Sequence, residues 1–332
     1  MKNILMIGTG GTIASEMTPS GLTPELNSKQ LLSFVPRIGE LCHVDCIQLY
    51  SLDSTNIRPA HWLGVAKTIQ ENYDRYDGFV ISHGTDTMAY TAAALSYLVQ
   101  GSPKPIVLTG AQKPIWFDGT DSKRNLTDAF LYACRGCGGV QIVFNGKVIL
   151  GTRARKERTK SYNAFSSVDY PEVAVIRERK LIRYLTPRSY AYGAEPRFYH
   201  RLEPRVLLLT LIPGMGAQAL EKLEEYYQGV IFQSFGVGGL PGGGEGPFAQ
   251  AMERWLNHGK TIVMMTQVPY EGSDMAVYQV GQQVKEKFQL MEAYNMTLEA
   301  AATKLMWVLG QTSRPEQVRE LFYRPVQHDV IC

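Results

Sequence analysis

The first half of the chain alternates short runs rich in aliphatic and β-branched residues with longer segments of helical periodicity. In Pro59–Tyr73, apolar residues recur every three or four positions, which predicts an amphipathic helix. The other helices expected here run from Asn27 to near Pro36, over Thr87–Val99 and over Leu126–Cys134. The expected strands are Lys2–Gly8, Val44–Tyr50, Phe79–Ser82, Ile106–Thr109 and Val140–Phe144. Buried strands separated by helices predict a mostly parallel sheet with helices on both faces.

The sequence also predicts a hairpin turn in the first half and an interruption of the strand–helix alternation further on. The dipeptide Asn145-Gly146 is typical of a tight hairpin turn, so Val148–Leu150 is expected to pair antiparallel with the strand before it. The alternation lapses around 187–204 and then restarts. The strands expected after it are Val206–Leu211, Val230–Ser234 and Thr261–Thr266, and the helices are Ala217–Tyr227, Phe248–Asn257, Leu298–Leu309 and Pro315–Phe322.

The length of 332 residues exceeds the usual domain size of about 100–200 residues. We therefore predict an α/β protein with two α/β domains. A larger N-terminal domain over 1–187 has a mostly parallel sheet with flanking helices and a β-hairpin. A linker covers 188–204, and a smaller C-terminal domain over 205–332 has a parallel sheet of its own.

Composition narrows the class of protein. Hydrophobic residues make up 45% and charged residues 20%, which is ordinary for a globular protein. A net charge of +3 is too small to indicate a nucleic-acid or membrane partner. The apolar run Ile4–Ile7 is too short for a signal peptide, and five cysteines do not suggest a disulfide framework. These features predict a soluble, cytoplasmic protein.

Several familiar sites are absent from the sequence. The glycine-rich segment at 8–13 lacks the third glycine of a dinucleotide fingerprint, and neither a P-loop nor a G-x-S-x-G elbow occurs. The spacing of Cys42 with Cys46, and of Cys134 with Cys137, would permit a four-thiolate zinc site. We favour the alternative that these cysteines are core residues, because free cysteine behaves as a small buried hydrophobe. No metal and no cofactor is expected.

Three segments rich in hydroxyl groups each follow a predicted strand. They are TGGTIAS at 9–15, DST at 53–55 and HGTDT at 83–87. Taken singly, Thr85 and Asp86 are typical helix-capping residues, and the segment at 53–55 is an ordinary turn. Carboxyl ends of parallel strands meet at one edge of a sheet, where ligands bind in α/β proteins. Together, the three segments therefore predict a binding or catalytic site.

Two of these segments, TGGTIA at 9–14 and HGTDT at 83–87, resemble the signature motifs of the bacterial-type L-asparaginase family. The similarity extends along the chain, for example through DGFV at 77–80 and SFGVG at 234–238, and it is closer to the cytoplasmic type I branch than to the exported branch. The resemblance implies hydrolysis of L-asparagine to L-aspartate and ammonia without a cofactor. It also implies a homo-oligomer, either a dimer or a tetramer of intimate dimers, with the catalytic site in the N-terminal domain.

The resemblance also implies roles for individual residues. Thr12 would be the nucleophile that forms an acyl-enzyme, and Thr85, Asp86 and Lys156 would form a second catalytic triad. Main-chain amides near Thr12 and Thr85 would stabilise the oxyanion.

Substrate binding is implied for the segment at 53–55 and for HGTDT. Ser54, with its neighbours Asp53 and Thr55, would hold the α-carboxylate of the substrate, and Asp86 would hold its α-ammonium group.

The sequence departs from the family pattern at three positions. Many members carry a tyrosine on the flexible loop after the nucleophile, where this chain has Leu22, so the base that activates Thr12 stays open. Gly239 replaces an asparagine in the second domain, and Val268 replaces the cysteine found in type I enzymes with an allosteric site.

Other functions remain open on the sequence alone. One is glutaminase activity, and another is the ammonia-supplying subunit of an archaeal glutamyl-tRNA amidotransferase, for which the basic stretch Arg153–Lys160 could contact tRNA. Against the latter, such subunits carry an added N-terminal domain, whereas this sequence starts directly with the catalytic sheet. A non-catalytic amino-acid sensor is the third alternative.

Overall fold

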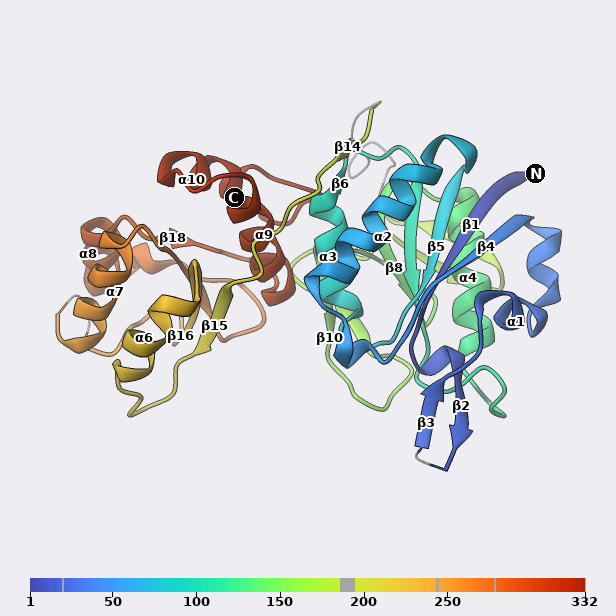
Figure 1. The fold of residues 1–332 in the computed structure, drawn as a ribbon, viewed down its shortest axis with the longest axis horizontal. Coiled ribbons are helices and arrows are strands. Elements are labelled where there is room, and N and C mark those ends of the chain that lie inside the picture. The colour runs from blue at the N-terminus through green and yellow to red at the C-terminus, as the bar shows by residue number, and fades with distance from the viewer. Residues whose placement is uncertain (20, 186–194, 243–244, 278, 332) are drawn as a thin grey trace. The chain divides into compact units, whose positions relative to one another are not determined.

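The computed structural model describes residues 1–19, 21–185, 195–242, 245–277 and 279–331. The chain forms two compact units, Met1–His200 and Arg201–Cys332 (Figure 1). Part of the predicted linker, 188–194, lies outside the described residues. Close to the division of the chain, the short strand β14 (Arg197–Phe198) pairs with β6 (Val99–Gln100) of the first unit.

The first unit is built on an eight-stranded sheet in the order β13-β12-β9-β8-β7-β5-β1-β4. The strands from β4 to β8 run parallel, and β9, β12 and β13 are joined antiparallel at the other edge. The predicted hairpin at Asn145-Gly146 is confirmed, because both residues have positive φ angles and join β8 to β9. The strand bounds are β1 (Lys2–Gly10), β4 (Cys42–Leu52), β5 (Gly78–Ser82), β7 (Pro105–Thr109), β8 (Gly139–Phe144), β9 (Lys147–Leu150), β12 (Ala174–Arg177) and β13 (Lys180–Arg183).

Helices cover both faces of this sheet, as the alternating pattern predicts (Figure 1). Helices α1 (Ser28–Ser33) and α4 (Ser122–Arg135) pack on one face, and α2 (Pro59–Asn72) and α3 (Met88–Leu98) lie on the other. The chain leaves β1 through α1 to reach β4, and then returns through α2 to β5 on the other side of β1. The strand order therefore reverses between β1 and β5, and this topological switch point is where open α/β sheets bind ligands.

Two small hairpins project from this framework. One pairs β2 (Ser15–Thr18) with β3 (Gly21–Pro24), and the other pairs β10 (Ala154–Lys156) with β11 (Phe165–Ser167). Neither was predicted, because strands of three or four residues are too short to show an alternating pattern. Short 3₁₀ turns complete the unit: Thr12–Ala14, Pro36–Glu40, Ser54–Asn56 and Tyr73–Arg75.

The second unit has a smaller sheet of four parallel strands, in the order β15-β16-β17-β18, which confirms the predicted architecture. The segment expected to be one helix over Ala217–Tyr227 is a short helix followed by a 3₁₀ turn at Glu224–Tyr226. The sequence pattern missed β18 and α8. The bounds are β15 (Val206–Thr210), β16 (Gly229–Ser234), β17 (Thr261–Thr266), β18 (Met291–Glu292), α6 (Gln218–Leu223), α7 (Pro247–Asn257), α8 (Gln279–Phe288), α9 (Leu298–Gln311), α10 (Pro315–Tyr323) and a 3₁₀ turn at Met275–Val277.

The cysteines of β4 and α4 belong to the core. Cys42 is buried, and Cys46 and Cys134 pack partly buried against the same apolar cluster. Within the described part of the chain, no group of three or more histidine, cysteine or acidic residues is placed to hold a metal ion. Nor does any described helix have the length and apolarity needed to cross a membrane.

Asp128 in α4 is a buried acid whose charge is poorly compensated. Its side chain is 7% exposed, and its Oδ2 atom has no hydrogen-bond partner among the described residues. Burial raises the pKa of the Asp128 carboxyl to about 6, although Arg124, with Nε 3.6 Å from Oδ2, acts in the opposite direction. The ionised form is therefore unfavourable in the native state.

We predict that Asp128→Asn becomes progressively more stabilising as the pH rises. The unfolded carboxyl ionises near 3.8 and the folded one near 6, so the wild type loses stability across this interval. The unfolding free energy of the variant relative to wild type should increase by about 2 kcal/mol between pH 4 and pH 7, measured by urea unfolding. The exposed Glu71 of α2 provides the control, since Glu71→Gln should change stability by less than about 0.5 kcal/mol at either pH. An Asp128→Asn effect that is the same at both pH values would contradict the assignment.

Candidate active site

The end of β1 is held against the end of β4 by two glycines. Gly10 and Gly11 have φ angles of 102° and 80°, a region that residues with a side chain rarely adopt. The N–H of Gly11 donates to the carbonyl oxygen of Leu52 at 2.9 Å, and a Cβ on Gly10 would lie 2.4 Å from that same oxygen. Thr12 follows directly and begins a 3₁₀ turn. The turn thus places Thr12 beside the segment that begins at Asp53.

A second close approach brings the end of β5 to the same place. A Cβ on Gly11 would lie 2.3 Å from both N and Cα of Gly84, and a Cβ on Gly84 would lie 2.6 Å from Cβ and Oγ of Ser54. The backbones of Gly11 and Gly84 and the side chain of Ser54 therefore pack together with no room for a further atom. The structure brings together all three hydroxyl-rich segments singled out in the sequence, at the switch point between β1 and β5.

The segment at 53–55 forms a small capped turn. The Oδ1 atom of Asp53 accepts hydrogen bonds from the N–H and the hydroxyl of Thr55, each at 2.8 Å. Ser54 is 4% exposed, and its carbonyl oxygen accepts a hydrogen bond from the Thr87 hydroxyl at 2.8 Å. This bond ties the turn to the HGTDT segment, while Asp53 and Thr55 face solvent.

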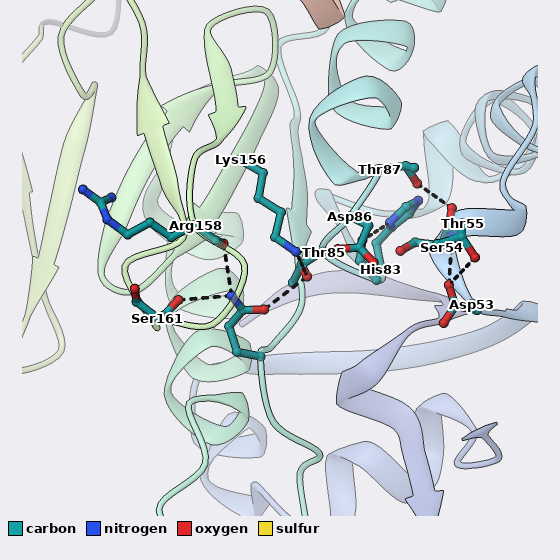
Figure 2. Close-up of polar contacts among 12 residues, drawn as sticks. Asp53, Ser54, Thr55, His83, Thr85, Asp86, Thr87, Lys156, Arg158 and Ser161 are labelled. Atoms are coloured by element: carbon teal, nitrogen blue, oxygen red, sulfur yellow. Dashed lines mark hydrogen bonds and ion pairs between the residues drawn. The ribbon is translucent and has the colours of Figure 1, made fainter. Parts of the chain in front are cut away.

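Thr85, Asp86 and Lys156 form a second cluster beside this contact (Figure 2). The Lys156 Nζ atom donates to Thr85 Oγ1 at 2.8 Å and to Asp86 Oδ1 at 2.5 Å. Lys156 lies at the end of β10 and pairs with Phe165 in the hairpin. Thr85 is buried, whereas the Asp86 side chain is 57% exposed. An ion pair thus lies next to a buried hydroxyl at the rim of the site.

The helix-capping alternative for Thr85 and Asp86 is wrong. Helix α3 begins at Met88 after Thr87 at the N-cap position, and no side chain makes a capping hydrogen bond there. The side chains of Thr85 and Asp86 contact Lys156 instead. Local sequence could not reveal this, because Lys156 lies about seventy positions further along the chain.

His83 is a neutral side chain that forms a hydrogen bond with the turn at Gly84. It is 1% exposed, and burial lowers the pKa of its imidazole to about 4. Nδ1 lies 2.7 Å from the carbonyl oxygen of Gly84, which can only accept, so Nδ1 carries the proton. Nε2 then accepts from the Thr91 hydroxyl at 2.9 Å, and Trp62 Nε1 donates to that hydroxyl oxygen at 3.0 Å. Every polar atom of the imidazole is thereby satisfied.

Gln112 is a residue of the site that the sequence analysis missed. Its Oε1 atom lies 3.3 Å from Thr85 Oγ1, and its Nε2 atom donates to the carbonyl oxygens of Ser161 and Arg158 at 3.1 and 3.4 Å. Gln112 follows the strand β7, which neighbours β5 in the sheet. Its place after a predicted strand was the one available signal, and it does not distinguish Gln112 from other residues near strand ends.

The hydroxyl of Thr12 is available for chemistry. Thr12 is half-buried, and its hydroxyl has no hydrogen-bond partner among the described residues. Leu22, on the β2–β3 hairpin that follows Thr12, is 47% exposed and offers no proton acceptor. The site therefore combines an unengaged hydroxyl, a second hydroxyl bound to a lysine and a carboxylate, and tightly packed main-chain amides.

The hydroxyl, carboxylate and ammonium groups at the switch point of this two-domain α/β fold are groups that hydrolysis of an amide through a covalent intermediate can use. The chain belongs to the asparaginase family: the family model for the asparaginase N-terminal region matches residues 3–189, and the model for the glutaminase/asparaginase C-terminal domain matches residues 205–322. This membership identifies it as a hydrolase acting on an amide, as the sequence predicts.

Individual relatives agree with this membership. The L-asparaginase of Thermococcus kodakarensis is 35% identical over 328 residues, which is 98% of each chain. The structure of the thermostable L-asparaginase from that organism matches with a TM-score of 0.93, at 34% identity and 99% coverage of both chains. The structure of L-asparaginase I from Vibrio cholerae matches with a TM-score of 0.88 at 27% identity, covering 100% of this chain and 99% of that one. This match to an L-asparaginase I agrees with the resemblance of the sequence to the type I branch. A glutamyl-tRNA(Gln) amidotransferase subunit from Metallosphaera sedula is 32% identical over 96% of this chain and 74% of that protein.

We predict that Gly11→Ala destabilises the protein far more than the same change at Gly119. Both glycines have positive φ angles, 80° and 68°, so alanine is strained at either position. Only Gly11 faces the Gly84 backbone, whereas nothing lies within 4 Å of a Cβ on Gly119. Urea unfolding should show a loss of about 1 kcal/mol for Gly119→Ala and at least about 3 kcal/mol for Gly11→Ala. Equal losses would contradict the close approach of the two strand ends.

Proposed function

We propose that this protein hydrolyses the side-chain amide of L-asparagine to L-aspartate and ammonia. The observation that carries the proposal is the convergence of the unengaged Thr12 hydroxyl and the Lys156–Thr85–Asp86 cluster at one switch point. The similarity to the L-asparaginase of Thermococcus kodakarensis over nearly the whole chain supports asparagine as the substrate.

In this scheme Thr12 is the nucleophile. Its oxygen attacks the amide carbon, its proton leaves with the departing nitrogen as ammonia, and an ester links the aspartyl group to Thr12. Water then attacks the ester carbonyl, releases aspartate and returns the proton to the Thr12 oxygen. Main-chain N–H groups near Thr12 and Thr85 stabilise the oxyanion at both steps, and they are preorganised because the glycine backbones around them are tightly packed.

Lys156 acts as a fixed positive charge that also binds Thr85. Its Nζ atom forms an ion pair with Asp86 Oδ1 at 2.5 Å, which holds the charge beside Thr85. The ammonium group therefore lowers the energy of negative charge that develops near Thr85.

The substrate's charged end is held by two turns. The Ser54 hydroxyl binds the α-carboxylate, and its neighbours Asp53 and Thr55 hold the turn that presents it, because Asp53 Oδ1 accepts hydrogen bonds from both the N–H and the hydroxyl of Thr55. Asp86 uses only Oδ1 for Lys156, and its Oδ2 atom has no partner among the described residues. That oxygen accepts the α-ammonium group of the substrate.

The second candidate is the ammonia-supplying subunit of a glutamyl-tRNA amidotransferase. It is favoured by the similarity to the Metallosphaera sedula protein. The basic stretch that would contact tRNA is only partly at the surface, because Arg153 is fully buried and Lys156 is engaged with Asp86. This makes asparagine hydrolysis the better candidate. The cytoplasmic location and the homo-oligomer, dimer or tetramer, stay predictions.

Ammonia release by the purified protein tests the proposal. Steady-state rates are measured over a range of asparagine and glutamine concentrations, without tRNA. Asparagine should give ammonia and aspartate in equal amounts, with the larger kcat/KM. Release from glutamine alone would favour glutaminase activity, and binding without release would favour a sensor.

We predict that Thr12→Ala lowers kcat for asparagine by about 10³-fold or more, because the nucleophilic oxygen is lost. The fold should survive, since the Thr12 hydroxyl holds nothing in place. Thr127→Ala, which removes a hydroxyl from the surface of α4, is the matched control and should keep the wild-type rate. A Thr12→Ala variant with more than about a tenth of the wild-type kcat would defeat the assignment.

We predict that Asp86→Ala mainly weakens substrate capture. Loss of a hydrogen-bonded carboxylate opposite an ammonium group should raise KM for asparagine about 10- to 100-fold. Asp86→Asn keeps the shape and removes the charge, so it should raise KM by a similar factor. An unchanged KM in both variants would show that Asp86 does not bind the α-ammonium group.

A further inference from the structure

We infer that Gln112 is a positioning residue that directs the hydroxyl of Thr85 during asparagine hydrolysis. The inference rests on the proposed function, because the orientation of Thr85 matters only if the site hydrolyses an amide. Gln112 lies at the end of β7, which borders β5, and its side chain spans the space between Thr85 and the loop that follows Lys156.

The direction of the hydrogen bonds at Thr85 follows from the donors and acceptors present. Lys156 Nζ can only donate, so Thr85 Oγ1 is the acceptor in their 2.8 Å contact. The proton of the Thr85 hydroxyl must then point to a different atom. Gln112 Oε1, at 3.3 Å, is its acceptor among the described residues. Lys156 therefore donates a hydrogen bond to Thr85, and Thr85 in turn donates one to Gln112.

The orientation of the Gln112 amide is equally determined. Its other end faces the carbonyl oxygens of Ser161 and Arg158 at 3.1 and 3.4 Å, and carbonyl oxygens only accept hydrogen bonds. The NH₂ group must face these carbonyls, which leaves Oε1 toward Thr85. The amide thus links Thr85 to the loop that begins just after Lys156.

The backbone of Gln112 is itself held firmly. The N–H groups of Gln112 and Lys113 donate to the Asp121 carboxylate at 3.0–3.1 Å. Asn125 Nδ2 donates to Asp121 Oδ2 at 3.1 Å and to the carbonyl oxygen of Gly110 at 2.9 Å. Because both flanks of Gln112 are anchored, its amide is presented to Thr85 from a rigid base.

This arrangement leaves Thr85 with one free hydrogen-bonding site. A hydroxyl has one proton and two lone pairs, of which Gln112 takes the proton and Lys156 takes one lone pair. The second lone pair accepts a hydrogen bond from the attacking group, the water or the Thr12 hydroxyl. Without Gln112, the Thr85 hydroxyl can rotate so that its proton points toward the substrate. In that orientation its second lone pair no longer accepts a hydrogen bond from the attacking group.

A double-mutant cycle between Gln112→Met and Thr85→Ser tests the inference, with kcat, KM and the melting temperature measured for each variant on asparagine. Methionine keeps the length of the side chain without its hydrogen bonds. Gln112→Met alone should lower kcat about 10-fold and change KM less than about 3-fold, as expected for an interaction used in the transition state. Serine lacks the β-methyl group that restricts the rotation of threonine, so it depends more on Gln112. Gln112→Met should therefore lower kcat by a larger factor in the Thr85→Ser background than in the wild type.

Gln141→Met is the matched control. Gln141 donates to the carbonyl oxygen of Gly138 at 2.8 Å near the amino end of β8, away from the strand ends that carry the site. It should leave kcat unchanged even if it lowers the melting temperature. If Gln112→Met does not fold, Gln112→Asn, whose amide is withdrawn by one methylene, replaces it in the cycle.

The outcomes separate the two proposals. An active wild type with a larger loss in the Thr85→Ser background supports the role of Gln112. An active wild type in which kcat falls by the same factor in both backgrounds, or not at all, overturns the role and leaves asparagine hydrolysis intact. A wild type that releases no ammonia from asparagine overturns both.

Discussion

The backbone contact between Gly11 and Gly84 is the constraint on which the site depends. With no side chain on either residue, the ends of β1 and β5 approach so closely that Ser54 fills the remaining space. A larger residue at either position would separate Thr12 from the segment that carries Thr85 and Asp86. The topology places this contact at the switch point, where the connections leave the sheet toward opposite faces and expose the strand ends.

Around this contact, charged and neutral groups have separate tasks. Below the turn, the neutral His83 holds the Gly84 carbonyl, and its burial keeps it uncharged at any pH well above 4. At the rim, the largely buried Lys156 forms an ion pair with Asp86, whose side chain is exposed. Thr85 lies between these layers, and its hydroxyl joins the charged rim to Gln112. The side chains of His83 and Thr85 thus hold this turn through hydrogen bonds to other parts of the protein.

Much of the framework was predictable from the sequence because the signals are local. Apolar runs, helical periodicity and the Asn145-Gly146 turn indicated the parallel sheets, the covering helices and the hairpin. The β10–β11 hairpin was not predictable in this way, because its strands are three residues long and owe their pairing to the surrounding structure. The capping interpretation of Thr85 and Asp86 failed for a related reason, since their partner is distant in the sequence and local preference favoured the helix end.

The sequence by itself determined the α/β architecture, the family and the three hydroxyl-rich segments, because each depends on residues close together in the chain. Only the tertiary structure decided which atoms of these segments meet and in which direction their hydrogen bonds run. The position of Gln112 shows the difference most clearly, because a lone glutamine after a strand has no distinctive local pattern. It becomes part of the site only when neighbouring strands set its amide between Thr85 and two carbonyl oxygens, where the geometry leaves a single orientation.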